Sequence, residues 1–388
     1  MSFTQTYEFG EKLYSSAFSE VRNCYHIGAD LHRTVNIVKN IQNDFSGFEL
    51  RSQLCKLLDL DHTNIVRVFD LLYDSKRLFM VLENWDGDLL LDILTRRTEI
   101  TERDIVDIAE QLLSALSFAH SKGVVHGNLH LGQIYLIESD EKYWVKVIGF
   151  GLSEIISYKH VQFLAPVISS DVWSVGVVLY ILFTGRPPFT RSEKSLSTPL
   201  DIELLKKVGA SESAVDFISK MLVVNPNYRI SAEFALMHPW IQLFKSEQPL
   251  CNSTLSLENL IRYRRSSAYK EAIHEFIATQ VLRNSEIKEL QEAFKVLDKN
   301  GDGKLARSKL QTYFAKKMPP DEADIIIDSI MSQTDTDNSG FLEYTEFIKA
   351  GAMQKHFLSK DNLMAAFSLL DADCNGCLLY TSPSPRDS

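Results

Sequence analysis

The spacing of hydrophobic and polar residues changes several times along the chain, and each change predicts a different kind of structure. Residues 7–83 carry short runs rich in β-forming side chains between turns, with one helical stretch at about 48–60. From about Thr101 the spacing becomes helical, and apolar side chains recur every three or four residues. This stripe consists of Ile105, Ile108, Ala109, Leu112, Leu113, Leu116 and Ala119. The pattern predicts a small, mainly β part followed by a large helical part.

A repeat marks the C-terminal part of the chain. Asp298, Asp335 and Asp371 each begin an acidic loop, and they lie 37 and 36 residues apart, as helix–loop–helix calcium units require. The second loop offers oxygen ligands at all six liganding positions and a glycine at the turn. These ligands are Asp335, Asp337, Ser339, Phe341 through its carbonyl group, Glu343 and Glu346. We therefore predict a calcium site in this loop.

The first and third loops are incomplete. The first ends in Lys309, where a bidentate glutamate is expected, so two ligands are lost and a cation repels calcium. We predict that this loop binds calcium weakly or stays empty. Its early ligands are Asp298, Asn300, Asp302 and, through its carbonyl group, Lys304. The third loop begins with Asp371, Asp373 and Asn375, but prolines at 383 and 385 forbid its exit helix.

The last residues, 377–388, resemble a translated library adapter. We exclude them from the fold and expect the natural protein to continue into a fourth unit.

Composition excludes several classes of function. The net charge of −10 argues against nucleic acid as a main partner. No apolar run approaches the length of a membrane span, and Ser2 stands where myristoylation needs glycine, so we expect no membrane anchor. The five cysteines and the lack of a secretory signal indicate reduced thiols. We expect a cytoplasmic location, with the nucleus as the alternative.

A second group of motifs has the outline of a phosphoryl-transfer centre. Residues 126–133 read HGNLHLGQ and residues 149–151 read GFG, where protein kinases have H-R-D-x-K-x-x-N and D-F-G. Residues 171–189 read DVWSVGVVLYILFTGRPPF, and NPNYRISA and HPWI follow at 225–232 and 238–241. Over residues 7–241 the chain thus resembles the calcium-dependent and calcium/calmodulin-dependent protein kinases.

This resemblance implies an α+β, bilobal kinase-like fold followed by an all-α EF-hand domain. The small lobe would cover about 7–83, the large lobe 84–241, a linker and junction 242–284, and the EF-hand domain 285–376. In such kinases the junction, here about 254–282, blocks the active cleft until the calmodulin-like domain withdraws it; a solvated linker helix is the alternative. The resemblance also implies a hydrophobic column between the lobes. Its members are Leu57, Val68, His126 and Phe150, anchored by Asp171.

The catalytic groups of this family are absent. Five positions that match the phosphate-binding lysine, its glutamate partner, the catalytic base and the two metal ligands are Asn36, Gln53, Asn128, Gln133 and Gly149. An asparagine amide cannot act as a base near neutral pH, and losing the base alone costs roughly 10²–10⁴ in rate. Lys39 lies three positions from Asn36 on a strand and therefore points to the opposite face. We expect no catalytic or cofactor-binding residues in this region.

Other departures concern the nucleotide and the large lobe. Tyr14, Ser16 and Ser19 replace the glycines that let a backbone approach phosphates. Thr34 and Tyr135 are bulkier than the residues that usually enclose adenine, so we predict little or no binding of ATP and magnesium, with Tyr135 partly filling the pocket. Separately, Val167 replaces the structural glutamate that pairs with Arg229 in the family.

Three functions remain open. The first is a calcium-binding pseudokinase that acts as a calcium-responsive scaffold or allosteric partner, for example of an active kinase or a kinase substrate. The second is an atypical Ser/Thr kinase with residual phosphate transfer. The third is an EF-hand calcium buffer with an inert kinase-like lobe. The missing catalytic groups and the complete second loop favour the first, with calcium as the expected cofactor.

Overall fold

A computed structural model of the chain describes most of both predicted domains. The described residues are 3–15, 19–29, 31–39, 54–74, 76–85, 87–96, 100–139, 142–152, 164–189, 199–245, 260, 273–282, 284–298, 300–315, 318–352 and 359–370. The predictions for Ser16, Gln53, the third loop and the C-terminal tail lie outside these residues.

The N-terminal part forms a five-stranded antiparallel sheet in the order β1-β2-β3-β5-β4. Its strands are β1 (Tyr7–Ser15), β2 (Ser19–His26), β3 (Leu31–Lys39), β4 (Val68–Tyr73) and β5 (Arg77–Leu82). A short helix, α1 (Phe3–Thr6), places Phe3 against the rings of Tyr7, Phe9 and Phe79. Residues 54–58 are helical. The predicted small, mainly β lobe is confirmed.

The next part is largely helical and carries a small sheet. Its helices are α3 (Leu90–Thr95), α4 (Glu102–Ser121), α6 (Leu164–Thr184), α7 (Ile202–Lys207), α8 (Glu212–Met221), α9 (Ala232–Leu236) and α10 (Pro239–Lys245), with short 3-10 turns η1 (Leu131–Gln133) and η3 (Pro226–Tyr228). The sheet consists of β6 (Asp88–Leu89), β7 (Ile134–Ser139) and β8 (Lys142–Val147).

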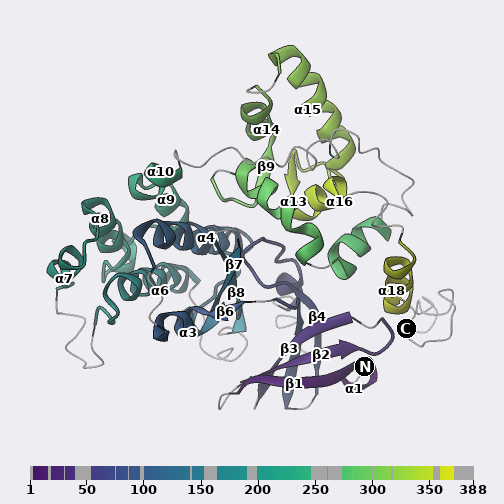
Figure 1. The fold of residues 1–388 in the computed structure, drawn as a ribbon, viewed down its shortest axis with the longest axis horizontal. Helices are drawn as coiled ribbons and strands as arrows, with labels where there is room; N and C mark the ends of the chain where they lie inside the picture. Colours follow the sequence, from purple (N-terminus) through teal and green to yellow (C-terminus); the bar gives the residue numbers. More distant parts are fainter. Residues whose placement is uncertain are drawn as a thin grey trace.

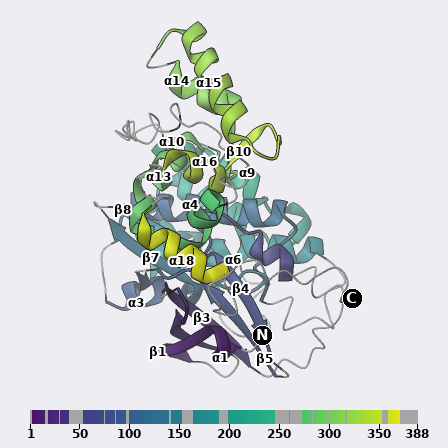
Figure 2. The same cartoon turned by 90° about the vertical axis from the view of Figure 1, so that its right-hand side faces the viewer.

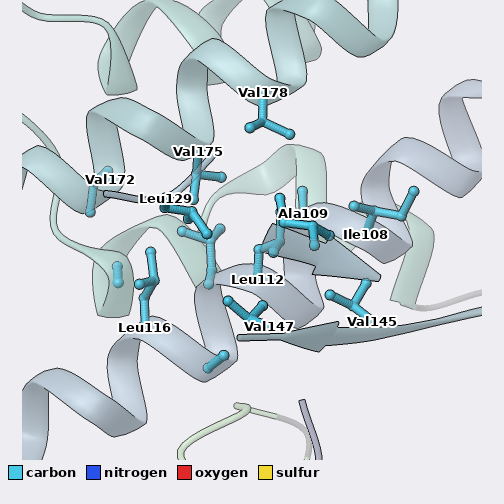
Figure 3. Close-up of a cluster of buried hydrophobic side chains, with 14 of the residues drawn as sticks. Ile108, Ala109, Leu112, Leu116, Leu129, Val145, Val147, Val172, Val175 and Val178 are labelled. Atoms are coloured by element: carbon cyan, nitrogen blue, oxygen red, sulfur yellow. The ribbon is translucent and has the colours of Figure 1, made fainter. Parts of the chain in front are cut away.

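Helix α4 is the centre of this lobe. Thr101 and Asp104 form a capping box at its start, which satisfies amide groups that would otherwise lack partners. The apolar stripe predicted from the sequence is entirely buried. It packs against α6 and β8, and Leu129 from the catalytic-loop region inserts between them (Figure 3). Burial of Leu129 in this core thus holds the catalytic-loop region in place.

The C-terminal part is a pair of helix–loop–helix units. Its elements are the π-helical turn η4 (Ile277–Val281), α13 (Asn284–Leu297), β9 (Lys304–Ala306), α14 (Arg307–Phe314), α15 (Pro320–Thr334), β10 (Phe341–Glu343), α16 (Tyr344–Gly351) and α18 (Lys360–Leu370). Strands β9 and β10 pair antiparallel, with Leu305 opposite Leu342. Both leucines are fully buried, so the two loops share one core.

The helix–loop–helix pair lies on one side of the kinase-like part, with α14 and α15 farthest from it (Figures 1 and 2). Helix α18 lies beside the small lobe: a Cβ on Gly28 would be 3.5 Å from the Ser368 carbonyl oxygen. Within the described residues, no helix combines the length and the apolar character needed to span a membrane.

Candidate functional site

The hydrophobic column between the lobes is present. Leu57, Val68, His126 and Phe150 are all buried in the main core. The ring centroids of His126 and Phe150 are 4.9 Å apart. Leu57 fills the space above Gly151, where an added Cβ would come within 2.5 Å of its Cδ2. The packing that joins the lobes of an active kinase is therefore retained.

Asp171 anchors the start of the loop. Its carboxylate accepts hydrogen bonds from the backbone N–H groups of His126, at 2.9 Å, and Gly127, at 2.7 Å. Burial lowers the pKa of His126, although the Asp171 carboxylate opposes this shift. A neutral imidazole fits the contacts, since Nε2 lies 2.9 Å from the Ile148 carbonyl oxygen and Nδ1 accepts from the Asn128 N–H group. The start of the loop is thus held by hydrogen bonds on both sides of the imidazole and by the Asp171 carboxylate.

Asn128 occupies the place of the catalytic base. Asn128 is exposed to solvent, two residues after the buried His126. Position and exposure suit contact with a substrate, but an amide oxygen does not accept a proton at neutral pH.

Gln133 and Gly149 lie side by side, and the Gln133 side chain occupies the space beside Gly149 where a larger residue would have its own side chain. A Cβ on Gly149 would lie 3.2 Å from Gln133 Oε1, which has no hydrogen-bond partner among the described residues. Gly149 also has a φ of +95°, which most side chains disfavour. Where two magnesium ligands are needed, the structure therefore has one neutral amide packed against a bare backbone.

Asn36 lies at the back of the same region. It is 5% exposed, and its Oδ1 atom has no partner in the described part of the chain. It lines a cavity of about 10 Å³ with Leu57, Met80 and Gly149, which is about the space of one water molecule. Lys39 instead pairs with Glu20, at 2.8 Å from Nζ to Oε2. This pairing fits the prediction that Lys39 does not replace the missing lysine, which stays a prediction.

The two bulky residues predicted to fill the adenine pocket both contact neighbouring side chains. Tyr135 packs edge-on against Trp85 with ring centroids 5.0 Å apart. Thr34 is 1% exposed and donates from Oγ1 to Asn84 Oδ1 at 3.3 Å. Both side chains are thus held in place by neighbours.

A buried lysine–glutamate ion pair exists, but it lies outside the small cavity that Asn36 lines. Lys146 Nζ and Glu83 Oε1 are 2.5 Å apart, and both residues are at most 9% exposed. They line a cavity of about 560 Å³ between the kinase-like part and the EF-hand helices, together with Trp144 and Tyr344. Sequence reasoning missed this pair, because neither residue belongs to a kinase motif.

Arg229 keeps a structural role without its usual glutamate. Its guanidinium group donates to the carbonyl oxygens of Val223, at 3.0 and 2.9 Å, and Ser169, at 2.5 Å, and lies over the Trp173 ring. Backbone carbonyl groups thus take over the acceptor role. The side chain of Val167 lies outside the described part.

The second loop has the geometry expected for calcium. Ligand atoms of Asp335, Asp337 and Glu346 all lie within 4.8 Å of one another. Asp335 accepts from the N–H groups of Ser339, at 3.0 Å, and Gly340, at 2.9 Å. Gly340 has a φ of +81°, the conformation for which a glycine is needed at this turn.

The other predicted ligands of the second loop make contacts within the loop or at the start of the following helix. The Ser339 hydroxyl group donates to the Phe341 carbonyl oxygen at 3.1 Å. Glu343 and Glu346 form a capping box at the start of α16, which turns the Glu346 carboxylate toward the loop.

The first loop gathers its ligands around a lysine. Lys309 Nζ lies 2.7 Å from Asp298 Oδ1, 2.5 Å from Asp302 Oδ1 and 2.5 Å from the Lys304 carbonyl oxygen. Asn300 Nδ2 donates to Asp302 Oδ2 at 2.8 Å. The sequence placed a cation at this position but did not indicate that it enters the loop.

Only Leu260 and residues 273–282 of the predicted junction segment are described. Leu260, Ile277 and Val281 are buried in the EF-hand core. The carbonyl oxygen of Gln280 accepts a hydrogen bond from Arg33 on β3. The described part thus connects the EF-hand domain to the small lobe.

Comparison with known proteins agrees with this arrangement. A protein kinase domain profile matches residues 7–241, and an EF-hand domain pair profile matches residues 287–350. The chain is 30% identical to calcium-dependent protein kinase 4 of Plasmodium berghei (strain Anka) over 96% of its own length and 78% of that protein. The chain belongs to the calcium-dependent protein kinase family.

Other family members show similar agreement. Calcium-dependent protein kinase 4 of Plasmodium falciparum (isolate 3D7) is 29% identical over 96% of this chain and 78% of its own length. Calcium-dependent protein kinase 11 of Oryza sativa subsp. japonica is 31% identical over 81% of this chain and 58% of its own length. The predicted family is confirmed.

A solved structure with a similar fold is the crystal structure of Rad53 1-466 in complex with AMP-PNP. It matches with a TM-score of 0.51 and 29% identity, over 61% of this chain and 65% of that chain. The predicted fold, a bilobal kinase domain followed by an EF-hand domain, is confirmed.

Proposed function

We propose that this member of the calcium-dependent protein kinase family is a calcium-binding pseudokinase, which acts by conformation or by binding a protein partner. The observation that carries the proposal is the pairing of Gly149 with Gln133 beside an intact hydrophobic column. Phosphoryl transfer depends on charge neutralisation and positioning by metal ions, a lysine and a base. Asn36, Asn128 and Gly149 supply none of these charges, whereas the hydrophobic column beside them is retained.

Calcium is the ligand that the EF-hand pair supports. We assign it to the second loop, with side-chain oxygens from Asp335, Asp337, Ser339 and Glu346 and the Phe341 carbonyl group. Glu343 at the ninth loop position, which often acts through water, is also 3.4 Å from Lys122 Nζ on the large lobe. Calcium binding at this loop would thus affect the Glu343–Lys122 contact between the EF-hand pair and the large lobe.

The test of the kinase lobe is a titration of the full chain with ATP and magnesium, paired with an autophosphorylation assay using radiolabelled ATP and calcium. We expect no micromolar ATP affinity and no incorporated label. A calcium titration of the same preparation supplies the control: it should give a binding heat that Glu346→Gln loses. Micromolar affinity together with calcium-dependent labelling would establish the atypical kinase instead.

A second experiment separates a switch from a buffer. Hydrogen exchange is compared with and without calcium at residues 257–282, in the natural sequence and in Glu346→Gln. A switch predicts that calcium changes exchange in this segment and that the variant abolishes the change. A passive buffer would bind calcium and leave exchange in the segment unaltered. Contacts of this segment with Arg33 and with the EF-hand core favour the switch.

A further inference from the structure

The first EF-hand loop is closed in the same way as the second. In the second loop, Asp335 accepts from the N–H groups of the fifth and sixth residues, Ser339 and Gly340. In the first loop, Asp298 accepts from the corresponding groups of Asp302, at 3.3 Å, and Gly303, at 2.7 Å. The first loop therefore has the closed conformation without the glutamate that normally completes it.

The ammonium group of Lys309 lies at the centre of this loop. An ammonium group has three donors, and here they face one carboxylate oxygen each from Asp298 and Asp302 and the Lys304 carbonyl oxygen. These oxygens belong to loop positions 1, 5 and 7, which bind calcium in a complete loop. The N–O distances of 2.5 to 2.7 Å are close to the calcium–oxygen distances of about 2.3–2.6 Å.

We propose that the Lys309 ammonium group is a permanent internal cation of the first loop, which keeps the loop closed and docked on helix α4 in the absence of calcium. Asp298 is buried, and its side chain is only 5% exposed, while that of Lys309 is 15% exposed. A buried carboxylate needs a charged partner, and the lysine supplies it from within the chain. Calcium would have to displace this ammonium group and would gain no ligand from position 12.

The docking surface depends on the closed shape of the loop. The Gly301 carbonyl oxygen accepts from Ser114 Oγ on α4 at 2.8 Å. A Cβ on Gly301 would lie 2.9 Å from Ser114 Oγ, and one on Gly303 would lie 2.8 Å from Phe118 Cδ2. Both glycines have positive φ angles, of +66° and +74°. The backbone of the closed loop thus fits directly against the large lobe, and an open loop would lose this fit.

The two EF-hand loops therefore have different roles. The first loop fixes the EF-hand pair to the large lobe at any calcium concentration, while the second responds to calcium. This inference concerns the loop and its contact with α4, and it holds whether or not the kinase lobe transfers phosphate.

Hydrogen exchange of the full chain in EGTA tests the proposal. In the natural sequence, amides of residues 302–304 and of the α4 surface should be protected without calcium, and added calcium should leave them unchanged. Lys309→Met removes the charge but keeps the length of the side chain, and it should speed exchange at 302–304 by roughly 100-fold, because a buried carboxylate then lacks its partner. The matched control is Lys304→Met, which removes a lysine of the same loop that points toward Glu343 and the Phe341 ring. Its loop should exchange like the natural one.

Lys309→Glu provides a rescue. In EGTA its first loop should be unprotected, and calcium should restore protection and add one bound ion relative to the natural sequence. The proposal is overturned if Lys309→Met keeps the natural protection in EGTA, if the natural loop needs calcium for protection, or if Lys309→Glu stays unprotected at millimolar calcium. Protection of the buried face of α6 shows in each case that the large lobe is folded.

Discussion

Leu57 lies between the two lobes, 2% exposed, where Gly151 leaves room for it. Truncation to alanine would leave a cavity in the column that also contains His126 and Phe150. Burial of this side chain contributes to stability whether or not phosphate is transferred, so the column has a structural role of its own.

We expect Leu57→Ala to lower the free energy of unfolding of the kinase lobe by about 2–5 kcal/mol. Urea denaturation followed by tryptophan fluorescence measures this, since all four tryptophans lie at or before Trp240. The control is Leu58→Ala, because Leu58 is the next residue and 38% exposed; it should cost well under half as much. Equal losses in the two variants would contradict the role of the column.

His62 provides a pH-dependent contribution. Its imidazole is buried and lies 3.0 Å from Ser114 Oγ, and burial lowers its pKa from 6.5 to about 3, with Lys146 adding to the shift and Asp302 opposing it. The folded protein therefore keeps His62 neutral, whereas the unfolded chain takes up a proton below pH 6.5. Stability is present above that value and falls as the pH decreases toward 3.

Between about pH 7.5 and about pH 5.5, this single group should cost about 1.4 kcal/mol of stability. The natural sequence should lose that much more than His62→Asn, which cannot titrate, when the unfolding free energies of both are measured at the two pH values. Equal pH dependence of the two proteins would show that His62 is not held neutral in the fold.

At the scale of elements, the two-stranded sheet joins the two EF-hand loops. Leu342 of β10 is fully buried opposite Leu305 of β9, while its neighbour Phe341 is 39% exposed. The first loop is held closed by its lysine, so β9 is a fixed edge on which β10 can form. The conformation of the second loop is therefore stabilised partly by the first.

Leu342→Ala should weaken calcium binding by roughly 10–100-fold, because the closed loop loses part of the core that supports it and binding is linked to that fold. Calorimetric titration measures this affinity. Phe341→Ala retains the backbone carbonyl ligand and should bind calcium like the natural sequence. If both variants bind alike, the sheet does not contribute to the site.

At the scale of the whole molecule, the EF-hand pair and the kinase lobes are joined by a few close contacts. Ser114 and Gly301 meet at 2.8 Å in a buried position. Lys122 and Glu343 form a partly exposed ion pair at 3.4 Å, and Lys295 lies over the Trp144 ring. Buried shape complementarity should matter more here than the exposed charges, because exposed ion pairs contribute only about 0–1 kcal/mol.

Ser114→Trp should therefore separate the domains, because a large side chain cannot fit under the loop. Small-angle X-ray scattering should record a larger radius of gyration. Lys122→Ala removes the exposed pair and the contact of Lys122 with the Phe118 ring, and it should leave the radius unchanged. A compact Ser114→Trp protein with a folded kinase lobe would show that α4 is not the docking surface.

The sequence alone determined the features that depend on neighbours along the chain. Strand and helix periods predicted the two lobes, and the α4 stripe is buried as its spacing requires. The ligands of an EF-hand loop lie within one short segment, so Asp335 to Glu346 could be identified by spacing alone. The missing charges at Asn36, Asn128 and Gly149 could also be identified by position within motifs.

Only the tertiary structure decided the features that join distant residues. The sequence did not show that Gln133 fills the space beside Gly149, that Arg229 turns to backbone carbonyl groups, or that Ser114 meets Gly301. The position of the Lys309 side chain is the clearest case. From the sequence its charge predicts repulsion of calcium. In the fold its ammonium group forms ion pairs with Asp298 and Asp302. The physical reason is that burial shields the Asp298 carboxylate from water, and the fold determines which cation lies beside it instead.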